Sequence, residues 1–339
     1  MPTGPTATRK RRTQTRSLSE RVRLTETLLQ AWHAIRRNGE TSRSAKTRQE
    51  TKEFGADLPR KLRSIQKRLH DRPYQFARQF GATPEKAKGK GKRPLVIAPL
   101  DDRIVQRAIL DVLQDASELA QVQEILETPT SIGGIRGRGV EHAINLIDNA
   151  YASGRANFVA GSDISGFFTK IPQSAVVDFI GRQTDDSEFV DLFARALKVD
   201  LANGSEMTPE DLKMFPTDDV GVAQGCPLSA LAGNIALRSF DQALNGRDII
   251  CIRYIDDFIL LGKRQRAVTK AFESAEILLA SMGMSIYKPS ERSDKAFSGP
   301  IGESIHFLGY CLAPGVYPPT QINREDVIAS VRAEFGQGR

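Results

Sequence analysis

Two apolar runs that flank an adjacent pair of carboxylates constrain the fold of this chain more than any other stretch. Residues 249–254 and 258–261 are rich in isoleucine, leucine and aromatic side chains, and Asp256 and Asp257 stand between them. This pattern predicts a tight β-hairpin that carries both carboxylates at its turn. Two like charges beside an apolar core are costly unless a cation balances them, and Mg²⁺ favours such oxygen ligands. The alternative is an ordinary hairpin in which aspartate serves as a turn former.

A third carboxylate follows another apolar run. Residues 157–162 predict a strand that ends in Asp163, and a tight bend follows it. Taken alone, Asp163 fits a cap or turn residue. Together with Asp256 and Asp257 it would complete a two-metal site, whose ions lie about 3.5–4 Å apart and clamp the attacking and leaving oxygens.

Five motifs occur in one order between about residues 92 and 310. Tyr254-Ile255-Asp256-Asp257 resembles the Tyr-x-Asp-Asp box of reverse transcriptases. The other four also resemble boxes of that family: Arg93–Pro99 followed by Asp102–Gln106, Asp163–Ile171, Gln224–Ser229, and Gly283–Lys288 followed by Phe307–Gly309. The likeness is to bacterial enzymes of the group II intron and retron type. The features of mobile-intron and retron enzymes are missing, so the defence-associated (unknown-group) reverse transcriptases are most similar.

The resemblance implies a set of catalytic and metal-binding residues. Asp163, Asp256 and Asp257, with the backbone carbonyl of Ile164, would hold two Mg²⁺ ions, for which Mn²⁺ would substitute. Lys288 would protonate or steady the leaving pyrophosphate, and its alternative is a lysine on the surface of a strand.

Five further residues are expected around the incoming nucleotide. By the resemblance, Arg93 assisted by Lys92 would bind the triphosphate, and a guanidinium fork matches phosphate oxygens. Phe168 would be the steric gate that excludes a ribose 2′-OH. Gln224 would contact the nucleotide, and Gly225 would let the following helix approach the template.

The same resemblance predicts contacts with the nucleic acid strands. The glycine-rich loop 131–139 carries two arginines that would contact the template backbone. The residues expected to touch template or primer are Arg136, Arg138, Ser229, Tyr254, Phe307, Leu308 and Gly309. The last three resemble the primer-grip turn of the family.

Charge is distributed unevenly along the chain. Residues 1–110 hold 27 Lys and Arg against 10 Asp and Glu, and the remainder holds 21 against 31. This suits an enzyme that binds a polyanion at one end and divalent metal at the other, although a solvated charged surface would look the same. A capping box at Ser17–Glu20 predicts a helix closed by Gly39, and a second, basic helix is expected at 57–70. No apolar run of membrane-spanning length occurs, and three widely spaced cysteines indicate a reducing, cytoplasmic setting.

These observations predict an α+β fold with the palm and fingers of a right-hand polymerase, in which the palm is an antiparallel sheet with helices. We expect a disordered basic tail at 1–16, N-terminal helices and fingers at 17–155, a palm with part of the fingers at 156–310, and a short C-terminal segment at 311–339. That segment is too short for a multi-helix thumb, so the thumb would be rudimentary or absent.

The expected function is RNA-directed DNA synthesis from deoxynucleotides, in an anti-phage defence system. The partners would be an RNA template, either a dedicated non-coding RNA or another RNA, the DNA product, and homo- or hetero-oligomeric subunits, with no membrane. The alternatives are a catalytically reduced palm-fold subunit that binds RNA or supports assembly, and a template-independent nucleotidyltransferase. RNA-dependent RNA polymerases and nucleotide cyclases share the palm, but Phe168 disfavours the former and the Gln224–Ser229 box the latter.

Overall fold

A computed structural model describes residues 16–42, 44–71, 73–85, 91–217, 219–302, 304–321 and 323–325. The predicted basic tail, apart from Arg16, lies outside these ranges, as do residues 326–339 of the C-terminal segment. Residues 86–90, where lysine and glycine predict a flexible turn, lie outside them as well. Within the described ranges, no helix is both long and apolar enough to cross a membrane.

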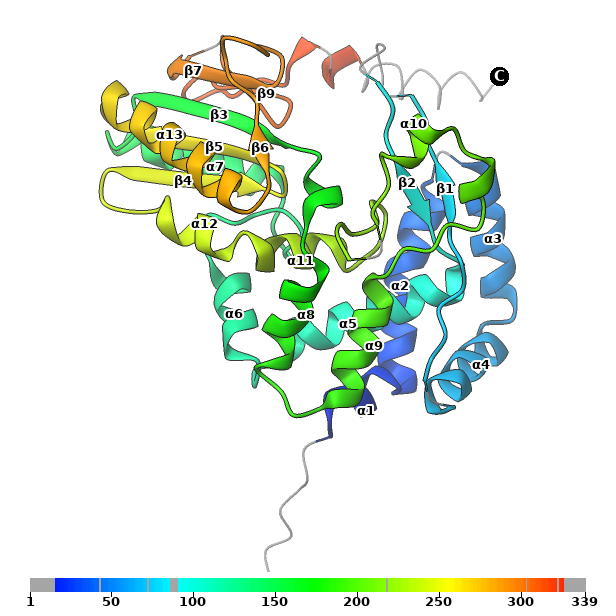
Figure 1. Ribbon diagram of the computed structural model, residues 1–339. Coiled ribbons are helices and arrows are strands. Elements are labelled where there is room, and N and C mark those ends of the chain that lie inside the picture. Colours follow the sequence, from blue (N-terminus) through cyan, green and yellow to red (C-terminus); the bar gives the residue numbers. More distant parts are fainter. Residues whose placement is uncertain are drawn as a thin grey trace, which may run out of the picture.

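A five-stranded antiparallel sheet forms the centre of the C-terminal half (Figure 1). Four strands lie in the order β4-β5-β3-β6, and β7 pairs with the edge of β3 that β5 leaves open. The strands are β3 (Phe158–Ser165), β4 (Ile249–Tyr254), β5 (Asp257–Gly262), β6 (Ser285–Ile286) and β7 (Ala296–Pro300). The predicted hairpin is therefore confirmed, and so is the α+β class. The predicted strand near Asp163 is confirmed at its start and wrong at its end, because β3 continues to Ser165 through its pairing with β6, so that Asp163 lies within the strand.

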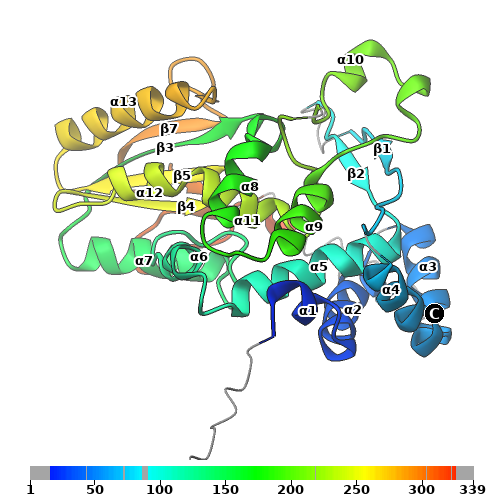
Figure 2. The same cartoon turned by 60° about the horizontal axis from the view of Figure 1, so that its bottom comes forward.

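Alternate residues of the central strands point to opposite faces, and each face buries its own apolar cluster. Ala160 and Leu260 belong to the cluster formed with helices α8 (Gln173–Gly181), α11 (Ser229–Ala236), α12 (Arg238–Ala243) and α13 (Gln265–Ser281). Val159 and Ile259 belong to the cluster formed with helix α7 (Val140–Ala152) and the C-terminal strands β8 (His306–Phe307) and β9 (Tyr310–Cys311). Figure 2 shows α13 and α7 on opposite sides of the sheet. The sheet is thus covered on both faces, and its hairpin turn is left at one end.

The helices supply the remaining layers of the molecule. The α-helices are α1 (Leu18–Val22), α2 (Thr25–Glu40), α3 (Ala45–Ala56), α4 (Leu58–His70), α5 (Leu100–Asp115), α6 (Ala120–Glu127), α7 (Val140–Ala152), α8 (Gln173–Gly181), α9 (Ser187–Leu197), α10 (Pro209–Leu212), α11 (Ser229–Ala236), α12 (Arg238–Ala243) and α13 (Gln265–Ser281), and the 3₁₀ helices are η2 (Phe167–Lys170) and η3 (Gly204–Glu206). The basic helix expected at 57–70 is confirmed as α4. One apolar cluster runs from Leu18 to Met284, across the boundary expected near residue 155.

The first predicted helix is correct at its start and wrong at its end. Ser17 and Glu20 form the capping box as expected. However, the helix stops at Val22, and a second helix, α2, begins at Thr25 and runs through Gly39 to Glu40. Gly39 does not close the helix: it allows α3 to approach, because a Cβ there would lie 2.2 Å from Oγ1 of Thr51.

A two-stranded hairpin lies apart from the sheet and contacts the turn that precedes α11. It consists of β1 (Phe80–Ala82) and β2 (Leu95–Ile97), and Figure 1 shows it beside α10. The backbone N–H of Val96 donates to the carbonyl of Gln224 over 3.0 Å. Val96 and Phe215 also share a small apolar cluster beneath the hairpin. This docking fixes the position of the hairpin relative to the turn that precedes α11.

Candidate active site

The sheet register brings two of the predicted carboxylates together. Asp163 and Asp257 are direct partners on β3 and β5, and Asp256 lies with Ile255 in the two-residue turn between β4 and β5. The N–H of Ile164 donates to the carbonyl of Asp256 over 2.9 Å, which ties the turn to β3. The prediction that both aspartates lie at the turn is therefore corrected: Tyr254 pairs with Asp257, so Asp257 is the first residue of β5.

The carboxylates differ in their electrostatic surroundings. Burial raises the pKa of Asp257 to about 7, and the neighbouring Asp256 carboxylate adds to this effect. Asp163 instead forms an ion pair with the Nζ of Lys295. Lys295 immediately precedes β7, and its carbonyl accepts a hydrogen bond of 3.2 Å from the N–H of Asp163. The sequence pattern missed Lys295, because only the pairing of β7 with β3 puts it next to this carboxylate.

The donor types suit Mg²⁺, but the side chains are not gathered around one point. Across the described parts of the chain, no group of three or more carboxylate, imidazole or thiol side chains is positioned to hold a metal ion. The carboxylate of Asp163 is instead paired with the ammonium group of Lys295. Asp163 and Asp257 still provide hard oxygen ligands on adjacent strands, and Ile164 follows on β3.

A cavity of about 480 Å³ connects the carboxylates with the predicted primer-grip turn. Asp163, Asp257 and Lys295 line it, and residues 306–309 line it as well. Leu308 and Gly309 form the turn between β8 and β9 with positive φ angles of 48° and 83°. The structure thus brings Phe307, Leu308 and Gly309 to the same cavity as two of the three aspartates.

The expected nucleotide-binding residues lie around the contact between β2 and the turn before α11. Gly225 has a φ of 119°, and a Cβ there would lie 2.9 Å from the carbonyl of Val96, so glycine permits this approach. Arg93 is exposed near the hairpin, and its N–H donates to Pro84. Lys92 Nζ is held by the carboxylate of Asp211 on α10 at 2.7 Å, and this hydrogen bond raises the pKa of Lys92.

Phe168 is linked to the same turn through its backbone. It lies in η2, which follows Gly166 with its positive φ of 61°. The carbonyl of Phe168 accepts a hydrogen bond of 2.7 Å from the N–H of Val222, two residues before Gln224. The half-buried ring of Phe168 packs 5.3 Å from that of Phe167. The predicted gate and the predicted nucleotide contact therefore belong to one packed unit.

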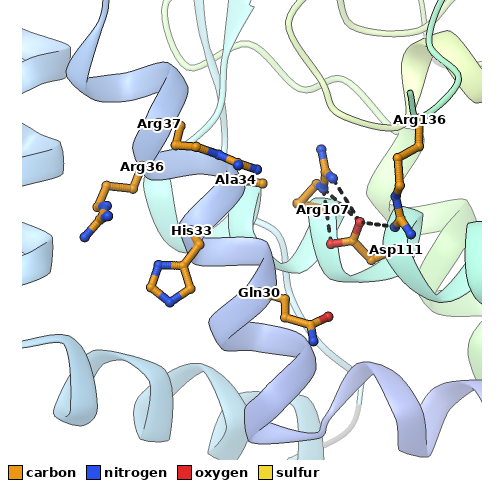
Figure 3. Close-up of a pocket in the computed structure, with 8 residues that line it drawn as sticks. All are labelled: Gln30, His33, Ala34, Arg36, Arg37, Arg107, Asp111 and Arg136. Carbon is orange, nitrogen blue, oxygen red and sulfur yellow. Dashed lines mark hydrogen bonds and ion pairs between the residues drawn. The ribbon is translucent and has the colours of Figure 1, made fainter. Parts of the chain in front are cut away.

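Three of the expected nucleic-acid contacts are anchored within the protein. Arg136 bridges Asp111 and Asp115 over 3.1 and 2.8 Å while its side chain remains 55% exposed, and Figure 3 shows it at a pocket beside α2 and α5. Arg138 donates to the carbonyls of Thr128 and Ser131. The hydroxyl of Ser229 is buried and donates to the carbonyl of Ala223 over 2.7 Å.

The two remaining predicted residues lie on either side of the sheet. Lys288 Nζ is 2.9 Å from the carboxylate of Glu276 on α13, and Lys288 does not line the cavity of the aspartates. Tyr254 is half-buried and packs on the cluster that contains α7. Arg253, the residue before it, is fully buried and was not predicted as a functional residue.

The chain resembles known proteins over most of its length. The family model described as reverse transcriptase (RNA-dependent DNA polymerase) matches residues 84–311. Protein YkfC of Escherichia coli (strain K12) is 26% identical over 264 residues, which cover 66% of this chain and 64% of YkfC. The chain therefore spans less than two thirds of the length of this curated relative.

Two solved structures illustrate the more distant likenesses. Apo telomerase from Candida tropicalis matches with a TM-score of 0.48 and 12% identity, over 70% of this chain and 47% of the telomerase chain. A partial Cas6-RT-Cas1–Cas2 complex matches with a TM-score of 0.42 and 22% identity, over 78% of this chain and 43% of the other. Because both TM-scores lie below 0.5, neither likeness supports a conclusion about function.

Proposed function

Because this chain belongs to the reverse transcriptase family, we propose that it is an RNA-directed DNA polymerase that adds deoxynucleotides to a 3′-OH. In this proposal the five-stranded sheet is the palm, and the N-terminal helices with hairpin β1–β2 are the fingers. The observation that supports it most is the register pairing of Asp163 with Asp257, with Asp256 in the adjoining turn.

The proposed metal ligands are the three aspartates and the carbonyl of Ile164. When bound there, two Mg²⁺ ions would stabilise the charge that develops on the attacking and leaving oxygens, and Mn²⁺ would substitute for them. The raised pKa of Asp257 means that this carboxylate must lose its proton before it serves as a ligand.

The protein's own contribution is positioning and charge. Arg93 would bind the triphosphate, and Lys92 would join it after leaving Asp211. Gln224 and Gly225 would hold the nucleotide against β2, with the ring of Phe168 where a ribose 2′-OH would project. Lys288 would assist the leaving pyrophosphate.

The nucleic acid would lie across the cavity and the glycine-rich loop. Phe307, Leu308 and Gly309 would grip the primer beside the carboxylates, because they share one cavity. We assign the template to Arg136, Arg138, Ser229 and Tyr254. Since Arg138 and Ser229 use their side chains within the protein, they would act by shaping the loop and the start of α11.

We further propose a cytoplasmic role in bacterial anti-phage defence, with a non-coding RNA or oligomeric partners. The support is the likeness of the motifs to defence-associated enzymes and the net charge of +7, which favours retained RNA. Sequencing the RNA that co-purifies at low salt and is lost at high salt would test this. A random mixture of cellular RNA would contradict a dedicated RNA partner.

The polymerase proposal is tested by deoxynucleotide incorporation with Mg²⁺, on RNA and DNA primer–templates and on co-purified nucleic acid. We expect product from the wild-type protein and none from Asp256→Asn/Asp257→Asn. Product that persists in the double variant would contradict the assignment of the site.

The ion pair between Lys295 and Asp163 favours a second candidate, a palm-fold subunit that binds RNA without catalysis. In that case, neither the wild-type protein nor Asp256→Asn/Asp257→Asn would make DNA product, while both proteins would retain equal amounts of RNA. A template-independent transferase would instead extend a primer when no template is added.

A further inference from the structure

The guanidinium of Arg253 is buried directly behind the carboxylate turn. Arg253 is the fifth residue of β4, its exposed fraction is 0%, and it lies three residues before Asp256. A charged group is rarely buried to this degree unless every polar atom has a partner. The hydrogen-bond partners of this guanidinium therefore indicate its role in the structure.

Every N–H donor of this guanidinium has an acceptor. Nε and Nη2 bind the two carboxylate oxygens of Asp241 on α12 over 2.8 and 2.5 Å. Nη1 donates to Oδ1 of Asn234 on α11 over 3.0 Å, and Nη2 donates to the hydroxyl of Ser131 over 2.9 Å. The fifth bond, from Nη1, goes to the carbonyl of Ile255 in the turn itself over 2.9 Å. One side chain thus joins two helices, a loop and the turn.

The turn needs such support because of its backbone. Ile255 has a φ of 60°, a conformation that is costly for a β-branched residue and persists only where surrounding contacts hold it. The hydrogen bond from Arg253 holds its carbonyl from the inner side. On another side, Gly133 lies so close that a Cβ there would be 2.5 Å from the nitrogen of Ile255.

Asn234 connects these two supports. Its Oδ1 accepts from Arg253, and its Nδ2 donates to the carbonyl of Gly133 over 3.1 Å. Arg253, Asn234 and Gly133 are therefore linked by hydrogen bonds. Arg253 donates to the carbonyl of Ile255, and Gly133 packs against the nitrogen of the same residue. The backbone reinforces these contacts, since the N–H of Arg253 donates to Thr130 and the N–H of Ile132 donates to Arg253.

A purely stabilising role would not require this arrangement. An apolar side chain at a buried position is often as stabilising as a buried ion pair. Burial alone would lower the pKa of the Arg253 guanidinium, but the Asp241 carboxylate outweighs it, so the pKa lies above its ordinary value and the group stays charged. A planar fork that bonds in several fixed directions is what lysine cannot supply.

We propose that Arg253 is a positioning residue, which with Asn234 holds the Ile255–Asp256 turn so that Asp256 and Asp257 are presented together for metal binding. The inference rests on the proposed function, because it assigns the carboxylates to a metal site. It predicts that loss of the fork affects the turn and metal affinity more than nucleotide binding.

The test uses two variants and a matched control. Arg253→Lys keeps the charge opposite Asp241, and Arg253→Met/Asp241→Asn removes both charges so that no lone ion is left buried. The control is Arg23→Lys, because Arg23 is also buried and forms an ion pair with Glu188, far along the chain from the turn. Mn²⁺ affinity is measured by electron paramagnetic resonance without substrate, and hydrogen exchange is measured for the peptide that contains residues 253–257.

We expect both Arg253 variants to weaken Mn²⁺ binding and to lower kcat by about 10- to 100-fold, as when the support of metal ligands is removed. Hydrogen exchange at the turn should accelerate, while the KM for deoxynucleotide stays within about threefold of the wild-type value. Arg23→Lys should lower the melting temperature and leave Mn²⁺ affinity and turn exchange unchanged.

Wild-type Mn²⁺ affinity and turn exchange in Arg253→Lys would overturn the positioning role. The same would follow if Arg23→Lys had equal effects on both, since the cause would then be general loss of stability. A wild-type protein that binds Mn²⁺ but makes no DNA would instead contradict the proposed function and leave the positioning role supported by the metal and exchange data.

Discussion

Asp163 and Asp257 are direct register partners on the antiparallel strands β3 and β5. The two positions are separated by 94 residues of sequence, and only the pairing of the strands makes them neighbours. Lys295 approaches Asp163 from the opposite edge of β3, so a carboxylate and an ammonium group flank this residue.

The affinity for Mg²⁺ should rise with pH through neutrality. The pKa of Asp257 is raised from 3.8 to about 7 by burial and then by Asp256, so the proton is held more tightly in the folded protein than in the unfolded chain. Without metal, the contribution of Asp257 to stability is present below pH 4 and is lost as pH rises through about 7. Below that value, each pH unit should lower apparent Mg²⁺ affinity by up to about tenfold.

Melting temperatures with EDTA and with Mg²⁺, recorded from pH 5 to pH 9, would check this. The stabilisation by Mg²⁺ should be larger at pH 8 than at pH 6. Asp257→Asn should remove most of the pH dependence. An equal Mg²⁺ effect at both pH values would show that Asp257 is already ionised at pH 6.

Replacement of Lys295 should make Mg²⁺ binding easier. The ammonium group of Lys295 neutralises Asp163, and a metal ion must displace it. For a partly exposed pair, Lys295→Met should lower the Mg²⁺ concentration at half-maximal rate by about three- to tenfold. Lys270→Met, on the exposed side of α13, is the control that removes one charge elsewhere. A higher Mg²⁺ requirement in Lys295→Met would mean that this lysine supports the site.

Truncation of Phe168 should relax sugar selectivity. Its ring packs beside Phe167, and its backbone is bonded to Val222, so the side chain can be shortened while the turn stays in place. Phe168→Ala should lower the preference for deoxynucleotides over ribonucleotides by at least about tenfold. Single-nucleotide incorporation with each sugar measures this, and Phe179→Ala on α8 controls for loss of a ring. Unchanged selectivity would reject the gate.

Gly133 should tolerate no side chain. A Cβ there would lie 2.4 Å from Cγ1 of Ile255 and 2.5 Å from its nitrogen, so the turn would have to move. Gly133→Ala should cost about 1–3 kcal/mol of unfolding free energy and reduce incorporation along with it. Gly246→Ala is the matched control, because its Cβ would meet nothing within 4 Å. Denaturant unfolding compares the two, and equal stabilities would refute the close contact.

Much of the fold could be predicted because it follows from local patterns. The apolar runs around Asp256 gave the hairpin, and the spacing of Leu62, Ile65 and Leu69 gave helix α4. The errors lie where one or two residues decide the outcome. Asp257 was expected in the turn but is the first residue of β5, because Tyr254 pairs with it. The helix expected from Ser17 to Gly39 is interrupted at Arg23 and Leu24.

The candidate site shows the same division. The apolar runs and the resemblance of the motifs predicted three carboxylates, and the resemblance alone predicted Phe168, Gln224 and a primer-grip turn. Their roles remain predictions. The partners of charged side chains could not be predicted. Lys92 with Asp211, Lys288 with Glu276 and Arg136 with Asp111 are pairs in which either residue could equally have faced solvent.

The sequence alone thus determined most of the elements and the residue types of the candidate site, because hydrophobic periodicity and a short motif act over a few residues. Tertiary structure decided which distant groups meet. Lys295 reaches Asp163 only because β7 pairs with β3, and Arg253 supports Ile255 only because α11 and α12 pack behind β4. Burial makes these contacts energetically important, because a charge removed from water needs hydrogen-bond or ion-pair partners, and only groups that the fold places nearby can supply them.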